Sequence, residues 1–207
     1  MAEAASTIGT GRLEAFSDGV FAVAITLLVL DLKVAGPGHG SLAGQLSAAW
    51  PQEASYLVSF MVIGIIWINH HTLMARYAAV DRPLLFLNLL LLLFVTVIPF
   101  PTSLLAQYLR EGGRDSHIAA ALYGAVMEGM GLSFSALFAW GGRHPELLVD
   151  RVTPSRHRMA LRQFGLGSVV YLIAIGIAFV SAPAALAAHF AIAVFYIFDR
   201  TSAPAPA

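Results

Sequence analysis

The chain has 207 residues, of which 58% are hydrophobic and 12% are charged, and its mean hydropathy is +0.75. Because a soluble domain carries about a quarter charged residues, this composition indicates a membrane protein. Twelve basic residues balance twelve acidic ones and there is no cysteine. The balance gives no sign of a nucleic-acid partner, and the missing cysteines exclude disulfides and thiolate metal ligands.

Six apolar stretches predict membrane-spanning helices, since a span needs about 20 mostly apolar residues. They lie at approximately 13–33, 54–75, 84–106, 117–140, 162–181 and 184–198. The segments between them, such as "AGPGHGSLAG", carry the glycine, proline and charge typical of loops. Within the third stretch, we expect Pro99 and Pro101 to kink and terminate the helix. A secretory leader is an alternative for the first stretch, but its length and the further spans favour a membrane helix.

These stretches predict an all-α polytopic membrane protein with one six-helix domain over residues 12–198. Residues 1–11 and 199–207 are then short tails. Basic residues are retained on the cytoplasmic side of a membrane. One side of the predicted topology collects nine of them: Arg12, Arg76, Arg82, Arg143, Arg151, Arg156, Arg158, Arg162 and Arg200. The other side has only three, Lys33, Arg110 and Arg114. The imbalance predicts that both termini are cytoplasmic.

The first span separates its residues by face. At about 100° per residue, an aliphatic stripe forms with Thr26 on its flank; its members are Phe16, Val20, Val23, Leu27 and Leu30. Glu14 and Asp18 fall on the opposite side. Lipid, a protein core and a dry pore lining would all accept such a stripe, so periodicity leaves these three environments open.

Asp18 lies inside the start of this span, where a carboxylate needs a partner or water. The second span brings "WINHH" to the same depth, with Trp67, Asn69 and His70 as suitable donors. Arg12 and Ser17 are close in sequence. We therefore predict a polar clamp behind the aliphatic stripe. His70 and His71 are adjacent and point about 100° apart on a helix, so hydrogen-bonded structural histidines are favoured over a metal site, and a proton relay is an intermediate possibility.

The pattern "R-x-x-x-F-S-D-G-V-F-A" at residues 12–22, followed by "ITLLVL", resembles the signature of the transmembrane protein 175 potassium channels. The similarity extends to "GIIWINHH" in the second span and to "PFPTSLL" at 99–105. It implies a six-helix unit per subunit, a homotetramer in a lipid bilayer, and K⁺ as the permeant ion with no cofactor. It also implies a pore lined by the first helix, with a constriction at Val23, Leu27 and Leu30 and with Thr26 contributing to selectivity. The family's polar network behind that helix corresponds here to Arg12, Phe16, Ser17, Asp18, Trp67, Asn69 and His70.

The chain has no T-V-G-Y-G loop, so a filter of stacked backbone carbonyls is not available. A ring of aliphatic side chains can instead close a pore by dewetting, because a cation in a narrow apolar neck loses hydration without compensation. Thr26 hydroxyls beside the neck would then offer oxygen ligands. We expect modest discrimination of K⁺ over Na⁺.

Glu128 falls near the middle of the fourth span, where ionisable groups are often functional. A protonated carboxyl hydrogen-bonded to a neighbouring helix is favoured, with Gly124, Gly129 and Gly131 allowing close approach. Asn88 and His189 receive the same structural interpretation.

A secondary transporter or proton-coupled carrier that uses Glu128 is the main alternative function, although no internal repeat is evident. An intramembrane enzyme is not expected, because neither GxSxG nor HExxH occurs. A purely structural membrane protein would leave the clamp motif unexplained. The single six-helix unit suggests a multi-pass protein of a prokaryotic plasma membrane.

Overall fold

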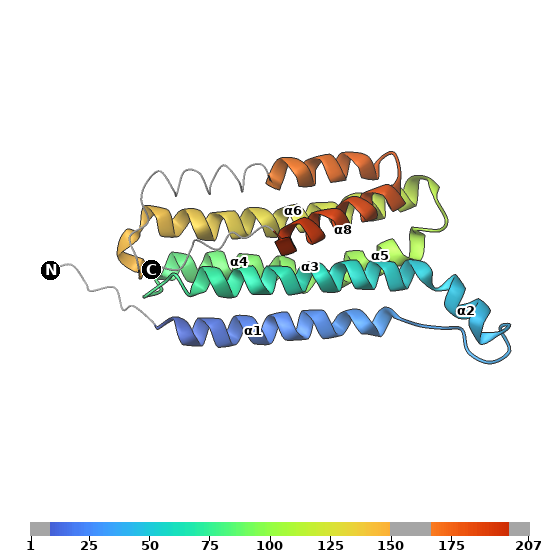
Figure 1. Ribbon diagram of the computed structural model, residues 1–207, viewed down its shortest axis with the longest axis horizontal. Helices are drawn as coiled ribbons and strands as arrows, with labels where there is room; N and C mark the ends of the chain where they lie inside the picture. The colour runs from blue at the N-terminus through green and yellow to red at the C-terminus, as the bar shows by residue number, and fades with distance from the viewer. Residues whose placement is uncertain (1–8, 150–166, 199–207) are drawn as a thin grey trace.

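The computed structural model describes residues 9–149 and 167–198. These residues form a bundle of long, nearly antiparallel helices, and α1 lies at one edge of it (Figure 1). In chain order the first four are α1 (Thr10–Leu27), which continues into a 3₁₀ turn η1 (Leu28–Asp31), then α2 (Leu42–Ala48), α3 (Trp50–Met74) and α4 (Arg82–Val97). They are followed by α5 (Pro99–Tyr108), α6 (Gly113–Arg143), a 3₁₀ turn η2 (Pro145–Leu147), a helix over Gly167–Ala178, and α8 (Ala182–Phe198).

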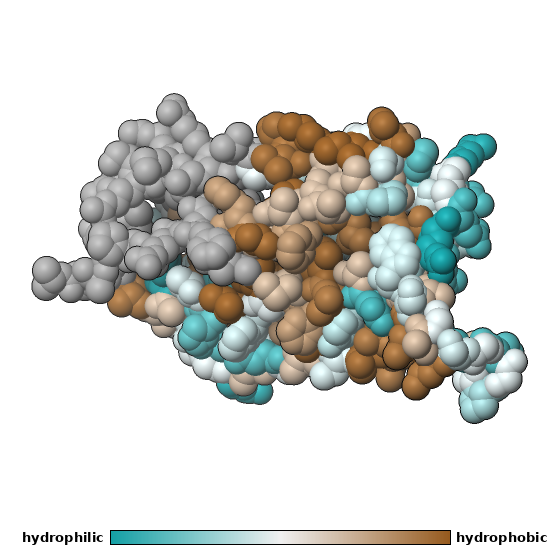
Figure 2. Space-filling view, turned by 45° about the vertical axis from the view of Figure 1, so that its right-hand side comes forward, coloured by the Kyte–Doolittle hydropathy of each residue, from teal (hydrophilic) through white to brown (hydrophobic). Residues whose placement is uncertain are grey.

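The all-helical membrane class is confirmed. Four of the described helical segments are long and apolar enough to cross a bilayer: Thr10–Asp31, Trp50–Met74, Arg82–Tyr108 and Gly113–Arg143. The predicted fifth and sixth spans correspond to two shorter apolar helices, Gly167–Ala178 and α8. Residues 162–166, where the fifth span was predicted to begin, lie outside the described part of the chain. Figure 2 shows apolar residues over the middle of one face and hydrophilic ones gathered at its right-hand end.

Two expectations about helix ends need correction. The segment "AGPGHGSLAG" is not all loop, because Ser41 caps the short helix α2 by accepting a hydrogen bond from the Gly44 N–H at 3.2 Å. Pro99 does interrupt the third span, as expected, since a proline cannot donate the i→i−4 hydrogen bond. The chain nevertheless resumes as α5 and stays helical to Tyr108, so the prolines kink this span without ending it.

The loops at the end where α3 stops and α4 starts are held together by a short pairing. Tyr77 and Leu148 form an isolated antiparallel bridge, flanked by backbone hydrogen bonds from Ala78 N to Leu147 O (2.8 Å) and from Val149 N to Arg76 O (2.9 Å). The Tyr77 hydroxyl donates to the carbonyl of Leu137 in α6 at 2.7 Å. Burial raises the pKa of Tyr77 to about 12, so this donor keeps its proton at ordinary pH.

Small residues allow α6 to approach its neighbours closely. A side chain on Gly129 would overlap the ring of Phe94 in α4, and one on Gly124 would meet Ile175 at 2.6 Å and His189 at 3.5 Å. Close approach at glycine is a common way for membrane helices to pack, because little hydrophobic force drives them together in lipid. The bundle therefore encloses its own core and leaves α1 covered on one side only.

Candidate functional site

One face of α1 packs into the subunit. Leu13, Ser17, Phe21 and Ala24 are buried, and Leu28 continues this row into η1. The row recurs every three or four residues, which is the spacing of one helical face. It contacts α3 and α4. This face, and not the one that carries Asp18, is the back of the helix, because Asp18 is itself exposed.

The other face of α1 carries the residues predicted to line a pore. Val23 is 56% exposed, Leu27 43% and Leu30 63%, and Thr26 is also exposed. Leu30 lies in the 3₁₀ turn. Side chains three residues apart eclipse in that geometry, which aligns Leu30 with Leu27. Val20, the remaining inner member of the predicted stripe, is half-buried. The described part of a single chain thus leaves a row of aliphatic side chains uncovered.

Thr26 offers an oxygen on this exposed face. Its Oγ1 lies 2.9 Å from both the Ala22 and the Val23 carbonyl oxygens, so the hydroxyl proton is donated back to the same helix. A hydroxyl has one proton and two lone pairs. The lone pairs remain free to accept a hydrogen bond or to bind a cation beside Val23 and Leu27.

The Asp18 carboxylate accepts a hydrogen bond from a residue of α3. The indole Nε1 of Trp67 donates to Asp18 Oδ1 at 2.8 Å, and both side chains are exposed. A hydrogen bond to an ionised acceptor is stronger than one between neutral groups. This contact joins the middle of α1 to the last two turns of α3, at the flank of the aliphatic row.

A second, fully buried contact set joins three helices at the same level. The Asn88 amide of α4 donates from Nδ2 to Ser17 Oγ at 3.0 Å, and its Oδ1 lies 2.7 Å from His70 Nε2. Because an amide oxygen can only accept, His70 donates from Nε2. The Ser17 hydroxyl itself donates a hydrogen bond to the Leu13 carbonyl oxygen at 2.8 Å. Asn88 therefore links Ser17 of α1 to His70 of α3.

Other predicted members of the clamp are not joined to it. Arg12 and Asn69 make no hydrogen bond or ion pair with other described residues, and Phe16 is 55% exposed on the aliphatic side. His71 is exposed while His70 is buried, so the two rings do not share an environment. Among residues 9–149 and 167–198, no group of three His, Asp or Glu side chains could hold a metal ion.

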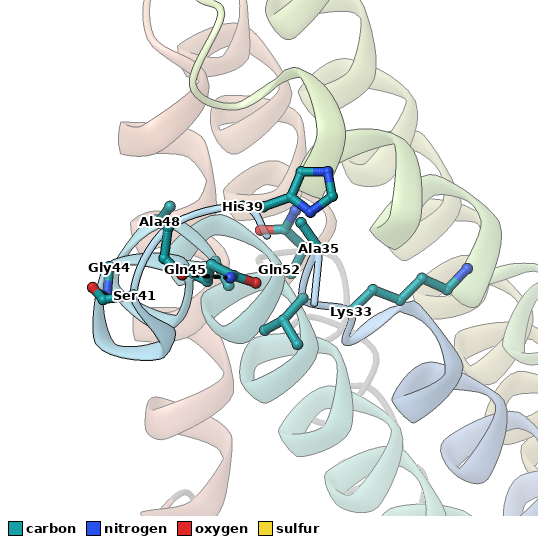
Figure 3. Close-up of a pocket in the computed structure, with 11 residues that line it drawn as sticks. Lys33, Ala35, His39, Ser41, Gly44, Gln45, Ala48 and Gln52 are labelled. Atoms are coloured by element: carbon teal, nitrogen blue, oxygen red, sulfur yellow. Dashed lines mark hydrogen bonds between the residues drawn. The ribbon is translucent and has the colours of Figure 1, made fainter. Parts of the chain in front are cut away.

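A hollow of about 390 Å³ lies beyond the far end of α1, between the following loop and α2 (Figure 3). Gln45 fastens the loop, accepting from Gly36 N at 2.8 Å and donating to Gly36 O at 2.9 Å. Gly36, Gly38 and Gly40 have φ near 90°, which glycine alone adopts readily. Lys33 and His39 line the hollow, and Lys33 extends away from the other labelled side chains.

Glu128 and His189 lie away from α1. Glu128 is 8% exposed and hydrogen-bonds Ser168 of the Gly167–Ala178 helix, while its Oε2 has no partner. His189 of α8 is 2% exposed, and its Nδ1 lies 2.8 Å from the Ala185 carbonyl. The Glu128 contact is the helix-to-helix hydrogen bond expected from the sequence, whereas the His189 contact stays within its own helix.

The sequence model of the endosomal/lysosomal potassium channel TMEM175 matches residues 12–99. A potassium channel of Streptomyces collinus is 51% identical over 196 residues, which covers 94% of this chain and 95% of the relative. The chain belongs to the TMEM175 family. A potassium channel of Chamaesiphon minutus is 35% identical over 201 residues, covering 95% of this chain and 97% of that one. The resemblance noted in the sequence is thereby confirmed.

Members of the TMEM175 family in animals match a smaller part. The human endosomal/lysosomal proton channel TMEM175 is 37% identical over 109 residues, 48% of this chain and 22% of the human protein. Among solved structures, a lysosomal potassium-selective TMEM175 homologue from Chamaesiphon minutus superposes with a TM-score of 0.80 at 33% identity, covering 93% and 98% of the two chains. These relatives are described as channels, so the prediction that the chain is not an enzyme is also confirmed.

Proposed function

We propose that several copies of this chain assemble around a common axis, with the exposed face of α1 turned inward, as a potassium-permeable cation channel. The observation that carries the proposal is the uncovered row of Val23, Leu27 and Leu30 on a helix whose opposite face is packed and hydrogen-bonded. The Streptomyces and Chamaesiphon relatives named potassium channels support the choice of ion. We further propose that the assembly is a homotetramer in a prokaryotic plasma membrane. Residues 12–198 form the channel domain, and both termini are cytoplasmic.

In this channel the aliphatic row acts as the gate. Rings of Leu27 and Leu30 from several copies would form a narrow apolar neck that expels water, and a cation entering it would lose hydration without replacement ligands. A small rotation or tilt of α1 would widen the neck and readmit water. Each Thr26 hydroxyl donates its hydrogen bond to backbone carbonyls of its own helix, so its oxygen lone pairs would be available as ligands for a partly dehydrated ion.

Two contact sets hold α1 in position, one at the flank of the aliphatic row and one on its buried face. The Asp18–Trp67 pair and the link through Asn88 lie at the same level of the bundle, so the middle of α1 is held to α3 and α4. Its far end continues into the 3₁₀ turn and the glycine-containing loop. We infer that the gate residues, beyond these contacts, are the part of α1 that moves.

The proposal is tested by passive ion flux into vesicles that contain the purified chain under a K⁺ gradient. Leu27→Ala and Leu30→Ala should each raise the K⁺ leak several-fold, because a smaller side chain widens the apolar neck. Leu93→Ala is the matched control, since Leu93 is 56% exposed on α4 and not on α1. Unchanged leaks from well-folded Leu27 and Leu30 variants would rule out the gate.

The same vesicles separate a channel from a carrier that uses Glu128. Flux through a pore should not saturate with increasing K⁺ concentration. It should also survive Glu128→Gln, because Glu128 is on α6, faces the Gly167–Ala178 helix and is not part of the α1 face. Flux that is strictly coupled to protons and abolished by Glu128→Gln would favour the carrier.

A further inference from the structure

Arg76 occupies an unusual position just beyond the end of α3. Its guanidinium carbon lies 5.9 Å from the centroid of the Phe138 ring in α6, and the side chain is half-buried. Within the described residues it has no carboxylate partner. A guanidinium placed over an aromatic ring keeps its edge donors available, because the ring occupies only its flat face.

Arg76 stands beside an apolar hollow and makes no ion pair with a described acidic side chain. A shallow depression of about 20 Å³ lies beside it, lined also by Leu73, Phe138, Gly142 and Leu148. Tyr77, on the same wall, is neutral because burial raises its pKa to about 12. The nearby Asp81 carboxylate already accepts from Trp140 Nε1 at 3.1 Å and from Leu84 N at 2.9 Å. No described acidic side chain pairs with Arg76.

Other cations gather at this end of the bundle, where α1 and α4 start and α3 and α6 stop (Figure 1). Arg82 lies with its guanidinium carbon 5.8 Å from the Phe86 ring centroid, and Arg143 is exposed at the end of α6. Neither has an ion-pair partner in the described ranges. Arg76, Arg82 and Arg143 thus place three guanidinium groups, none of them in an ion pair with a described residue, at this end of the membrane helices.

We propose that Arg76 binds the phosphate of an anionic phospholipid, whose acyl chains lie along the apolar surface below it. A planar guanidinium fork matches phosphate oxygens, and basic pockets between membrane helices suit anionic headgroups. The wall beside Arg76 is mostly apolar, which suits contact with a lipid chain better than a free anion. Arg76 directly follows α3, the helix that holds Asp18 through Trp67, so the lipid would fasten the α3 end from which α1 is positioned.

Native mass spectrometry of the full chain, with phosphatidylglycerol and phosphatidylcholine added in turn, tests this site. Wild-type protein should bind phosphatidylglycerol more tightly than phosphatidylcholine. Arg76→Gln should weaken phosphatidylglycerol binding about five- to tenfold and leave phosphatidylcholine unchanged. Arg114→Gln makes the same charge change at the opposite end of the bundle and should have no effect. Arg76→Lys keeps the charge without the fork, so it should give an intermediate affinity.

Three results would overturn the site: phosphatidylglycerol bound no more tightly than phosphatidylcholine, Arg76→Gln binding like the wild type, or equal weakening by Arg114→Gln. Displacement of the lipid by inorganic phosphate would assign the site to a soluble anion and also overturn the proposal. If Arg76→Gln fails to fold, Phe138→Leu removes the supporting ring and should weaken phosphatidylglycerol binding in the same direction. Wild-type affinity in a folded Phe138→Leu protein would then count against it.

Discussion

Asn88 shows what a single polar side chain does in this bundle. It is fully buried and satisfies Ser17 and His70 at once, on two different helices. Ser17 and His70 were predictable as members of a polar network, because they stand beside Asp18 and Trp67 in the motif. Asn88 was expected only as a structural hydrogen-bonding residue. The clue to its bridging role is a lone amide in the apolar run "LLFLNLLLLLF", since such a group requires partners inside the membrane.

Replacing Asn88 by Ala should destabilise the protein by about 1 to 3 kcal/mol, because the His70 and Ser17 groups would be left buried without partners. The measurement is the free energy of unfolding in detergent or lipid. Asn69→Ala is the control, since Asn69 is half-buried and has no hydrogen bond to another described residue. Equal losses from the two variants would show that the link through Asn88 contributes nothing specific.

Arg12 and Asn69 were expected in the polar clamp, but neither makes a hydrogen bond or ion pair with another described residue. Sequence spacing places polar groups at the same depth, but it does not determine which of them meet. That choice depends on the rotation of each helix about its axis, which is set by packing against neighbours. Trp67 reaches Asp18, whereas Asn69, two residues later, points about 200° away on the same helix.

At the scale of helices, the spans were predictable because long apolar runs identify them almost independently of tertiary context. The first and last residues of the helices were less predictable than the existence of the spans. The helix α2 has only seven residues, too few to form a long apolar run, and the capping residue Ser41 was the sequence signal for its start. The prolines at 99 and 101 correctly marked a kink, but helical residues beyond them carried α5 on to Tyr108.

The packing of α4 against α6 makes a prediction at this scale. Gly129→Ala should destabilise the protein by about 1 to 3 kcal/mol, because the added methyl group overlaps the Phe94 ring and forces it to move. Gly176→Ala is the matched control in the Gly167–Ala178 helix, since its new Cβ would meet nothing within 4 Å. Alanine's better helix propensity should leave that variant unchanged or slightly more stable. Thermal unfolding would separate the two, and a stabilised Gly129→Ala would contradict the close contact.

At the scale of the whole molecule, the exposed apolar face of α1 indicates which surface joins copies of the chain. The face of α1 that remains uncovered in one chain is aliphatic and also carries a hydroxyl, a combination that suits a water-filled pore with an apolar neck better than plain lipid contact. Periodicity alone could not select among lipid, protein core and pore for this stripe. The structure excludes the core of the subunit, since Val23, Leu27 and Leu30 are all exposed.

Cysteine accessibility tests the central claim most directly, because the chain has no cysteine and each variant adds a single thiol. Leu30→Cys should react with a charged, water-soluble thiol reagent, lose K⁺ flux on modification, and form disulfide-linked pairs of subunits under mild oxidation. Leu93→Cys on α4 should show no loss of flux on treatment. If the Leu30→Cys thiol reacts only with lipid-soluble reagents and its modification leaves flux unchanged, the α1 face points to acyl chains and the pore lies elsewhere.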